Sequence, residues 1–236
     1  MNERTIERLN QINQEFYRIT AGSFDESRGR PWPGWDALLP HLPASLTVLD
    51  AGCGNGRFGL FLAQHLGAAN VAYTGIDSSS ELLARARTAL QSLDAHLELR
   101  DLLRESLPDG KPYDLVALFG VLHHIPGHHR RLALLRDLAQ RVKPGGLLAF
   151  SAWRFYEYPR FRERIIPWPD DLQAEAGDYL LDWRRGERAV RYCHYVDDAE
   201  HVALVRATGL TEIASYRADG RSGDLNRYSL LRRETV

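Results

Sequence analysis

The sequence predicts an α/β fold built on a doubly wound, mostly parallel sheet of seven strands, with an N-terminal helix and an aromatic-rich insertion. Over residues 46–150, five short apolar segments alternate with amphipathic helical segments. This is the pattern of parallel strands joined by right-handed helical crossovers. Two more strand-like segments, 210–216 and 226–232, are separated by a turn-rich stretch and predict an antiparallel pair that completes the sheet.

The individual elements follow from local periodicity and from helix breakers. Apolar residues spaced by three and four predict an amphipathic helix over residues 3–19. An irregular stretch (22–33) and a short helix bounded by prolines (35–42) precede the first strand. A helix over 128–142 is expected to stop at Lys143-Pro144-Gly145-Gly146. The other elements are expected at 46–51 (strand), 71–77 (strand), 82–93 (helix), 96–100 (strand), 113–119 (strand), 147–150 (strand) and 197–208 (helix).

We expect a single domain, 1–236, because the chain has the length of one generous domain and 44% of its residues are hydrophobic. Within it, residues 1–44 are expected to form an N-terminal helical lid, 45–150 the ligand-binding core, 151–195 a substrate-side insertion and 196–236 the C-terminal helix and strand pair. The insertion is rich in tryptophan, tyrosine and proline. These aromatic residues serve either a substrate pocket or only the packing of a loop.

Charge and cysteine content restrict the function. The formal net charge is −1, so any contact with nucleic acid has to come from a local patch. The two cysteines, Cys53 and Cys193, make neither a disulfide framework nor a metal quartet. The chain begins with polar residues and has no apolar run of 18 residues. We therefore expect a cytoplasmic protein that has neither a membrane nor DNA as its partner.

The most informative segment is a glycine loop after the first strand. Asp50 ends the strand, and Gly52, Gly54 and Gly56 follow at spacings of two before a helix begins. Glycines allow positive φ and close approach of a ligand to the backbone, and a helix N-terminus points free N–H groups at that ligand. A dinucleotide fingerprint needs its third glycine where Arg57 stands. The alternative is a turn that serves only helix–sheet packing.

The pattern D-x-G-x-G-x-G resembles motif I of the class I S-adenosylmethionine (SAM) methyltransferases, which have a Rossmann-like fold. The resemblance implies that SAM is the cofactor and that Asp50 and the three glycines hold its methionine end. Asp77, at the end of the second strand, is expected to accept both ribose hydroxyls, although it or a following serine can instead cap the next helix. Asp101 and Leu102 are expected at the adenine edge, and a surface turn is the alternative for Asp101.

The segment after the fourth strand is expected at the ligand edge of the sheet. It includes Phe119, His123 and His124 and resembles the motif IV region of the same enzymes, which lines the transferring methyl group. Phe119 is assigned to the cofactor site, and either histidine is a candidate base or acceptor contact, with core packing as the alternative. His128 and His129 add to the cluster, but we expect no metal because no cysteine or acidic ligand is near in the sequence.

Two further segments resemble a narrower family, the tRNA wobble-uridine carboxymethyl methyltransferases, which form a methyl ester on a uridine side-chain carboxylate. Residues 16–33 resemble the Tyr, Phe, Arg and Pro-Trp-Pro signature of that family. The run Arg191-Tyr192-Cys193-His194 resembles its Arg-Tyr-Tyr-His segment, with a cysteine in place of an aromatic residue. Together with the glycine loop and the motif IV segment, the resemblance covers most of the chain.

This resemblance implies roles for residues in both segments. Arg28 and Arg191 are expected to hold the acceptor carboxylate as bidentate forks, which suits a group that is ionised at pH 7 and needs no base. Tyr17 and Trp32 are expected to line SAM or the uracil ring, and His194 to lie on the substrate side. The alternatives are surface ion pairs for the arginines and core packing for Trp32. The implied partner is tRNA, and a small activator subunit, as in eukaryotic relatives, is a candidate second partner.

Three other functions remain open at this point. A small-molecule metabolite is the alternative acceptor, favoured by the near-zero net charge and by an aromatic insertion able to close a pocket. A nicotinamide-dependent oxidoreductase is disfavoured by the glycine spacing. A non-catalytic partner protein with a SAM fold would bind the cofactor without turnover, or not bind it.

Overall fold

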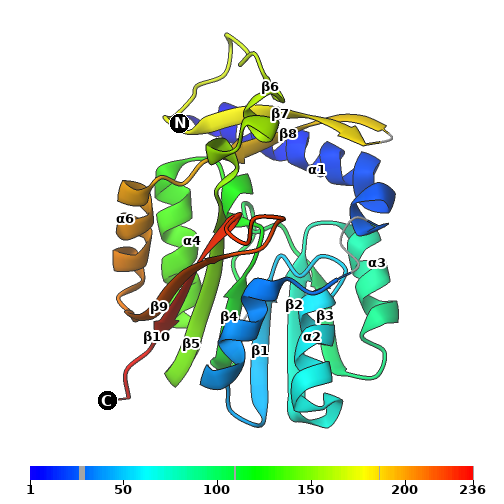
Figure 1. The fold of residues 1–236 in the computed structure, drawn as a ribbon, viewed down its shortest axis with the longest axis vertical. Coiled ribbons are helices and arrows are strands. Elements are labelled where there is room, and N and C mark those ends of the chain that lie inside the picture. The colour runs from blue at the N-terminus through cyan, green and yellow to red at the C-terminus, as the bar shows by residue number, and fades with distance from the viewer. Residues whose placement is uncertain (27–29, 109, 186, 236) are drawn as a thin grey trace.

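The structure is a computed structural model that describes residues 1–26, 30–108, 110–185 and 187–235. Its centre is a seven-stranded sheet in the order β3-β2-β1-β4-β5-β10-β9, in which β10 alone runs against its neighbours (Figure 1). The strands are β1 (Leu46–Ala51), β2 (Val71–Asp77), β3 (Asp94–Leu99), β4 (Tyr113–Leu118), β5 (Val142–Trp153), β9 (Thr211–Ala218) and β10 (Asn226–Arg232). The prediction of a doubly wound, mostly parallel sheet of seven strands is confirmed.

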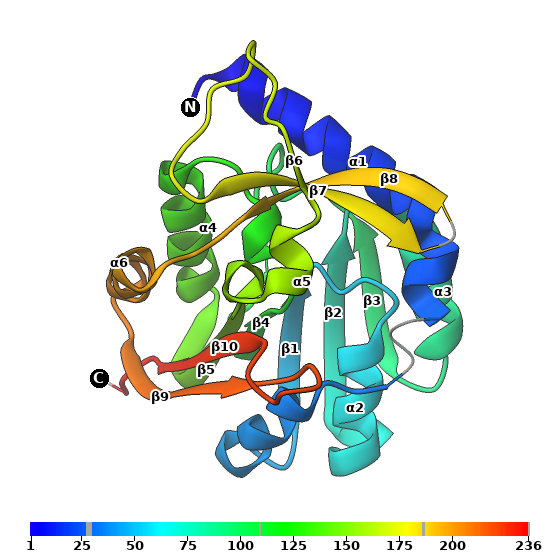
Figure 2. The ribbon, with the colours of Figure 1, turned by 45° about the horizontal axis from the view of Figure 1, so that its top comes forward.

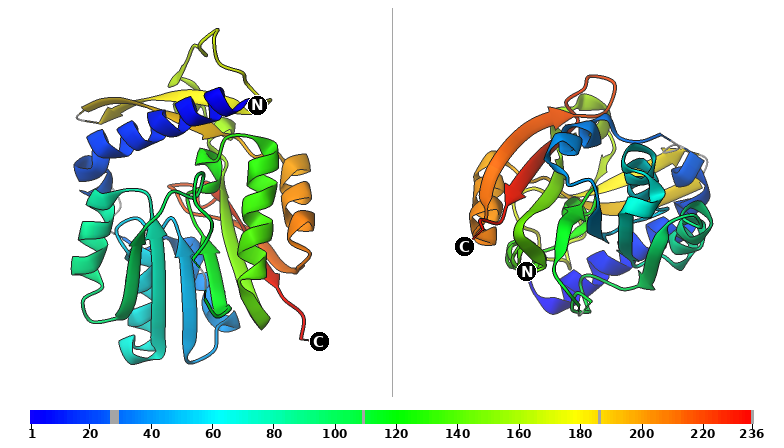
Figure 3. Two further views of the ribbon diagram at one scale, coloured as in Figure 1. Left: turned by 180° about the vertical axis from the view of Figure 1, so that it is seen from behind. Right: turned by 90° about the horizontal axis from the view of Figure 1, so that it is seen from below.

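Both faces of the sheet are apolar. Successive side chains of a strand point to opposite faces, and in the central strands both sets of side chains are apolar. In β1, Leu46 and Val48 belong to one core cluster, and Leu49 and Ala51 belong to the other. Helices cover both faces (Figure 3). The 3₁₀ helix η1 (Pro33–His41), α2 (Arg57–Leu66) and α3 (Ser80–Ala89) lie on the first face, and α4 (His128–Gln140) and α6 (Asp198–Thr208) on the second.

A roof covers the carboxyl ends of the parallel strands. Helix α1 (Glu3–Glu26) crosses above this edge. A second sheet of three antiparallel strands lies over the same edge and contacts α1 through its edge strand β8 (Figure 2). Its strands are β6 (Ile165–Ile166), β7 (Asp178–Arg185) and β8 (Glu187–His194). Open α/β sheets bind ligands at this edge, so the roof encloses the expected site.

Short helical turns connect these elements. They are η2 (Ala68–Asn70), η3 (Leu122–His124), η4 (Phe155–Glu157) and α5 (Pro159–Arg162). Among the helices of the described part of the chain, none is both long and apolar enough to cross a membrane.

The structure differs most from the predicted elements in three places. Helix α1 continues to Glu26, into a stretch expected to be irregular. Residues 143–146, expected to form the turn after α4, already belong to β5, which pairs with β4 from Val142 opposite Tyr113 and then shifts register. The insertion, 151–195, contributes the β6–β8 sheet, which the sequence analysis did not assign. Its aromatic and β-branched residues suit a half-buried pleated surface.

Candidate active site

A cavity lies at the carboxyl ends of β1, β2 and β4, beneath α1. It holds about 1110 Å³ of free space when its open mouth is included. The walls are formed by the glycine loop, the ends of β2 and β3, the segment after β4, and one face of α1. Most site residues expected from the sequence line it: Tyr17, Trp32, Asp50, Gly52, Gly54, Asp77, Asp101, Leu102, Phe119 and His124.

The glycine loop turns through three left-handed residues. Gly52, Gly54 and Gly56 have φ angles of 80°, 55° and 81°, a region that residues with a Cβ rarely adopt. A Cβ on Gly52 would lie 2.1 Å from Cγ2 of Val121, whereas a Cβ on Gly54 would meet no atom within 4 Å. Gly54 therefore borders open space in the cavity. Gly56 lies outside the lining and precedes α2, where it packs against Leu90.

Asp50 lies beneath this loop and is almost fully buried, with the hydroxyl of Tyr73 donating a hydrogen bond to its Oδ2. Burial raises the pKa of Asp50 to about 7, although the hydrogen bond from Tyr73 opposes the shift. An opposite charge beside a buried acid favours its ionised form. The arrangement can therefore hold a cationic group of a ligand in the cavity.

Asp77 ends β2 and is held by backbone N–H groups. Its Oδ2 accepts a hydrogen bond from the N–H of Gly54 at 2.8 Å, and its Oδ1 accepts one from the N–H of Ser79 at 2.9 Å. Burial raises the pKa of Asp77, and these two bonds oppose the shift. Ser79 caps α3, because its Oγ accepts from the N–H of Leu82. Each oxygen of Asp77 keeps a further lone pair with which it can accept from a ligand hydroxyl.

Asp101 connects the core to α1. Its Oδ2 accepts hydrogen bonds from Nδ2 of Asn10 at 2.8 Å and from Nε2 of Gln14 at 3.1 Å. Its Oδ1 accepts from the N–H of Leu103 at 2.9 Å. Asn10 and Gln14 themselves line the cavity, as does Leu102. This wall of the cavity is therefore built jointly by the end of β3 and by the roof helix.

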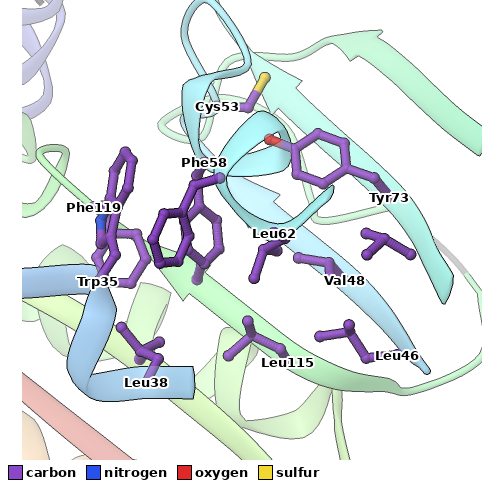
Figure 4. Packing of buried hydrophobic residues seen from close by; sticks show 14 of the residues in the cluster. Trp35, Leu38, Leu46, Val48, Cys53, Phe58, Leu62, Tyr73, Leu115 and Phe119 are labelled. Carbon is purple, nitrogen blue, oxygen red and sulfur yellow. The ribbon is translucent and has the colours of Figure 1, made fainter. Parts of the chain in front are cut away.

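Aromatic rings form another wall. Phe119, at the end of β4, lies with its ring centroid 5.0 Å from that of Phe58 and 6.0 Å from that of Trp35 (Figure 4). Trp32 packs closely on Gly120, where a Cβ would come within 2.9 Å of the indole. Phe119 and Trp32 thus contribute both to the core of the domain and to the cavity surface.

Both ring nitrogens of His124 take part in hydrogen bonds that fix the ring. Nδ1 lies 2.9 Å from the carbonyl oxygen of Tyr192, and Nε2 lies 2.9 Å from the hydroxyl of Tyr17. A carbonyl oxygen only accepts, so Nδ1 carries a proton. Asn13 connects the same elements, because its Oδ1 accepts from the N–H of Tyr192 at 2.8 Å and its Nδ2 donates to the carbonyl oxygen of His124 at 3.4 Å.

His123 and Arg191 lie outside the lining of the cavity. His123 is buried, and its ring centroid is 5.1 Å from that of Trp153. The guanidinium of Arg191 lies 4.5 Å from the centroid of Trp153, and 5.3 and 5.6 Å from those of Phe16 and Trp183. Arg191 is only 7% exposed and makes no hydrogen bond or ion pair with any residue of the described part of the chain.

His194 also lies outside the cavity lining. Its Nδ1 is 2.7 Å from Oδ1 of Asp178 and its Nε2 is 2.6 Å from Oε2 of Glu200, so both nitrogens carry protons. Burial alone would lower the pKa of His194, but the two acids outweigh it and raise the pKa. Glu200 also accepts from Nε of Arg131 on α4 at 2.7 Å. His194 therefore connects β8 to α6 through Glu200, and Glu200 in turn connects to α4 through Arg131. This position gives no support to the expected substrate contact.

Arg28 lies outside the described residues, so the structure does not place the first of the two expected arginine forks. A cysteine does lie near the histidines in the fold, contrary to the expectation, because ligand atoms of His123, His124 and Cys193 lie within 4.8 Å of one another. However, a metal ion taking a nitrogen of His124 would have to break one of its two hydrogen bonds.

The polar face of α1 is a part of the site that was not predicted from the sequence. Asn10, Asn13 and Gln14 line the cavity together with Tyr17. These positions recur at i, i+3, i+4 and i+7, which is the spacing of one helix face. The signal was present in the sequence as a stripe of amide side chains beside the apolar stripe of the same helix. Only the fold shows that Asn10 and Gln14 of this stripe meet Asp101.

Comparison with known proteins identifies the family. Residues 49–148 match a family model described as a methyltransferase domain. Trans-aconitate 2-methyltransferase from Azoarcus sp. (strain BH72) is 35% identical over 227 residues, and the match covers 78% of this chain and 86% of that protein. The chain belongs to the class I SAM-dependent methyltransferases.

Other relatives of this methyltransferase carry a different name. The tRNA (carboxymethyluridine(34)-5-O)-methyltransferase of Schizosaccharomyces pombe is 27% identical over 218 residues, covering 86% of this chain and 90% of that one. The protein of that name from Xenopus tropicalis is 28% identical, and the match spans 75% of this chain but only 26% of the relative.

Solved structures show the same methyltransferase fold. A SAM-dependent methyltransferase from Methanosarcina mazei aligns with a TM-score of 0.68 at 20% identity, covering 87% of this chain and 99% of the other. A SAM-bound amino pentose methyltransferase from Micromonospora echinaspora aligns with a TM-score of 0.60 at 20% identity, covering 90% and 96%.

The cofactor of this methyltransferase is SAM. The residues of the cavity fit it. Gly54 has a positive φ and open space where a side chain would stand, so the backbone can approach a ligand closely. The buried acid Asp50 suits a cationic group, and the acceptor oxygens of Asp77 suit a diol.

Proposed function

We propose that this enzyme transfers the methyl group of SAM to a carboxylate, and that this carboxylate belongs to a carboxymethyl-type wobble uridine in tRNA. The proposal rests mainly on the surroundings of Arg191. Its guanidinium is buried among three aromatic rings and meets no carboxylate in the described part of the chain. The three rings face a buried charge that meets no anion among the described residues, and such a charge is unfavourable. An anionic acceptor would supply that partner and gain a bidentate contact.

In this proposal the cavity residues hold the cofactor by complementary chemistry. Asp50 and the glycine loop bind the methionine end, Asp77 accepts from the two ribose hydroxyls, and Asp101 and Leu102 face the adenine. SAM supplies an electrophilic methyl group on a positively charged sulfur. The protein binds and orients both reactants, which is its main task in an in-line displacement.

A carboxylate acceptor needs no base. Carboxyl groups are ionised at pH 7, so one oxygen can form the bond to the methyl carbon directly. The bond between that carbon and sulfur breaks, its electron pair stays on sulfur, and the products are a methyl ester and S-adenosylhomocysteine (SAH). No proton is transferred, so neither His123 nor His124 has to act as a base. Arg191 and, by the family resemblance, Arg28 would hold the acid.

The names of the relatives support the chemical class of the acceptor. Trans-aconitate and carboxymethyluridine, the compounds named in two of them, both carry carboxylates. The likeness of residues 16–33 and 191–194 to the wobble-uridine enzymes favours the RNA acceptor.

A small polycarboxylic acid is the second candidate acceptor. It is favoured by a net charge of −1 and by the insertion, whose residues 151–195 include eight arginines and eight acidic residues and so present no basic excess to RNA.

The test is transfer of labelled methyl from SAM to two acceptors, tRNA with 5-carboxymethyluridine at the wobble position and trans-aconitate. The matched control is the same tRNA with an unmodified uridine. The proposal expects label in the carboxymethylated tRNA and none in the control. Label in trans-aconitate alone would retain the carboxylate and replace the RNA with a small acid. Label in neither acceptor would overturn the proposal.

A further inference from the structure

We propose that Tyr17 and His124 form a hydrogen-bonded pair that presents the phenolic oxygen of Tyr17 to the positively charged sulfonium end of SAM. This inference depends on SAM occupying the cavity and not on the identity of the acceptor. Both side chains line the cavity, yet they come from distant parts of the chain, α1 and η3.

The direction of the two hydrogen bonds of His124 follows from the carbonyl oxygen of Tyr192, which can only accept. The carbonyl oxygen of Tyr192 accepts from Nδ1 of His124, so the neutral ring has its lone pair on Nε2. Tyr17 therefore donates its hydroxyl proton to Nε2 across 2.9 Å. A hydroxyl that donates becomes a better acceptor, because hydrogen bonds in a chain polarise one another. The phenolic oxygen of Tyr17, a residue that lines the cavity, is thus partly negative.

The pair is held in place on both sides. Asn13 bonds the backbone of Tyr192 and of His124, which fixes the distance between β8 and η3. The rings of Tyr17 and His124 meet edge to face, with centroids 5.6 Å apart and planes at 83°. The roof sheet therefore sets the protonation pattern of a residue that faces the cavity.

Along helix α1, Tyr17 lies away from the residues at the expected adenine end of the cavity. Asn10 and Gln14 bond Asp101, and Tyr17 is one turn beyond Gln14 on the same helix face. Seven residues of helix, from Asn10 to Tyr17, correspond to a rise of about 10 Å. Helix α1 therefore spans the cavity from the expected adenine carboxylate to the wall formed by Trp32 and His124. A partly negative oxygen at this second end suits a cation that carries a transferable methyl group.

The test compares the binding of SAM with that of SAH, which lacks the methyl group and the sulfonium charge. Isothermal titration calorimetry gives both dissociation constants. Tyr17→Phe is expected to weaken SAM about two- to fivefold more than SAH, the range of a weak C–H···O contact to a polarised oxygen. Gln14→Met, at the other end, is the control and should weaken both ligands equally. An equal loss for Tyr17→Phe would overturn the proposal.

A second variant tests the role of His124 in the pair. His124→Asn can keep a donor to the carbonyl oxygen of Tyr192 while it removes the acceptor at Nε2. It should reduce the preference for SAM over SAH as Tyr17→Phe does, and the double variant should reduce it no further. A His124→Asn protein with the wild-type preference would show that Tyr17 does not act through this pair. Thermal unfolding of each variant checks that the fold is retained, and failure of wild-type protein to bind either ligand would overturn the cofactor premise itself.

Discussion

The hydroxyl of Tyr73 donates a hydrogen bond to the carboxylate of Asp50 beneath the glycine loop, where both side chains are at most 3% exposed. Burial raises the pKa of Asp50 to about 7. The acid is therefore mostly neutral at pH 6 and mostly ionised at pH 8. A cationic ligand binds the ionised form better, so binding below pH 7 has to release a proton.

We expect the affinity for SAM to rise up to about tenfold from pH 6 to pH 8 and to level off above that. Calorimetry in buffers of different ionisation enthalpy measures both the affinity and the proton released. Asp50→Asn should bind more weakly at pH 8 and lose the dependence on pH. Affinity that stays constant in the wild-type protein would exclude Asp50 as the group that meets the cation.

Asp77 should be the strongest single contributor to cofactor affinity. Two hydrogen bonds from ribose hydroxyls to a carboxylate together correspond to about a hundredfold or more in affinity. We expect Asp77→Ala to reduce SAM binding by this amount. It should also lower the melting temperature, because the carboxylate holds the N–H groups of Gly54 and Ser79. Unchanged affinity, measured by calorimetry, would remove Asp77 from the ribose role.

Two glycines of the loop should respond differently to the same substitution. Gly54→Ala places a methyl group in open cavity space, so it should weaken SAM strongly while costing about 1–2 kcal/mol of stability for the left-handed φ. Gly52→Ala drives a Cβ to 2.1 Å from Val121 and should destabilise the fold more. Urea unfolding and SAM titration of both variants check this. The opposite order of stabilities would contradict the described loop geometry.

His194 should make stability depend on pH. Its pKa is raised in the folded protein, so its contribution is complete below about pH 6.5 and is lost as the pH rises through the folded pKa. His194→Gln should cost about 3 kcal/mol at pH 6, because it leaves the acids Asp178 and Glu200 without the imidazolium. The difference in unfolding free energy between the two proteins should shrink towards pH 9. A difference that is constant over this range would show that the charged imidazolium of His194 does not stabilise the fold through Asp178 and Glu200.

Arg191 should affect the acceptor and not the cofactor, because it lies outside the cavity lining. Arg191→Met keeps an apolar side chain at this position and removes the charge. We expect a rise of about tenfold or more in KM for the acceptor, from the loss of a charge-assisted contact, with little change in SAM affinity. Arg188→Met on the exposed part of β8 is the control. Weakened SAM binding in Arg191→Met would assign the arginine to the cofactor.

Local sequence signals were sufficient for the main sheet. The strands from β1 to β5 are apolar runs between glycine, proline and helix signals, and the spacing from Asp50 to Gly56 predicted the glycine loop that borders the cavity. The β6–β8 sheet was missed because aromatic residues fit a loop or a strand equally well. The contacts of Asp101 with Asn10 and Gln14 were missed because they join residues 91 and 87 positions apart.

The role of His194 could not be read from its motif. Its position in the Arg191–His194 run predicted a substrate contact, yet its nitrogens meet acids on β7 and α6. Strand alternation explains the difference, since Arg191 and Cys193 point to one face of β8 and Tyr192 and His194 to the other. Neighbouring residues of one sequence motif therefore have different surroundings in the fold.

The bond in the product distinguishes the proposed methyl ester from every other product of methyl transfer. After reaction with methyl-labelled SAM and the preferred acceptor, the product is treated with mild base. We predict that the label is released as volatile methanol, because esters hydrolyse under these conditions. Label that stays on the acceptor after this treatment would show an ether, amine or carbon acceptor and would exclude a methyl ester.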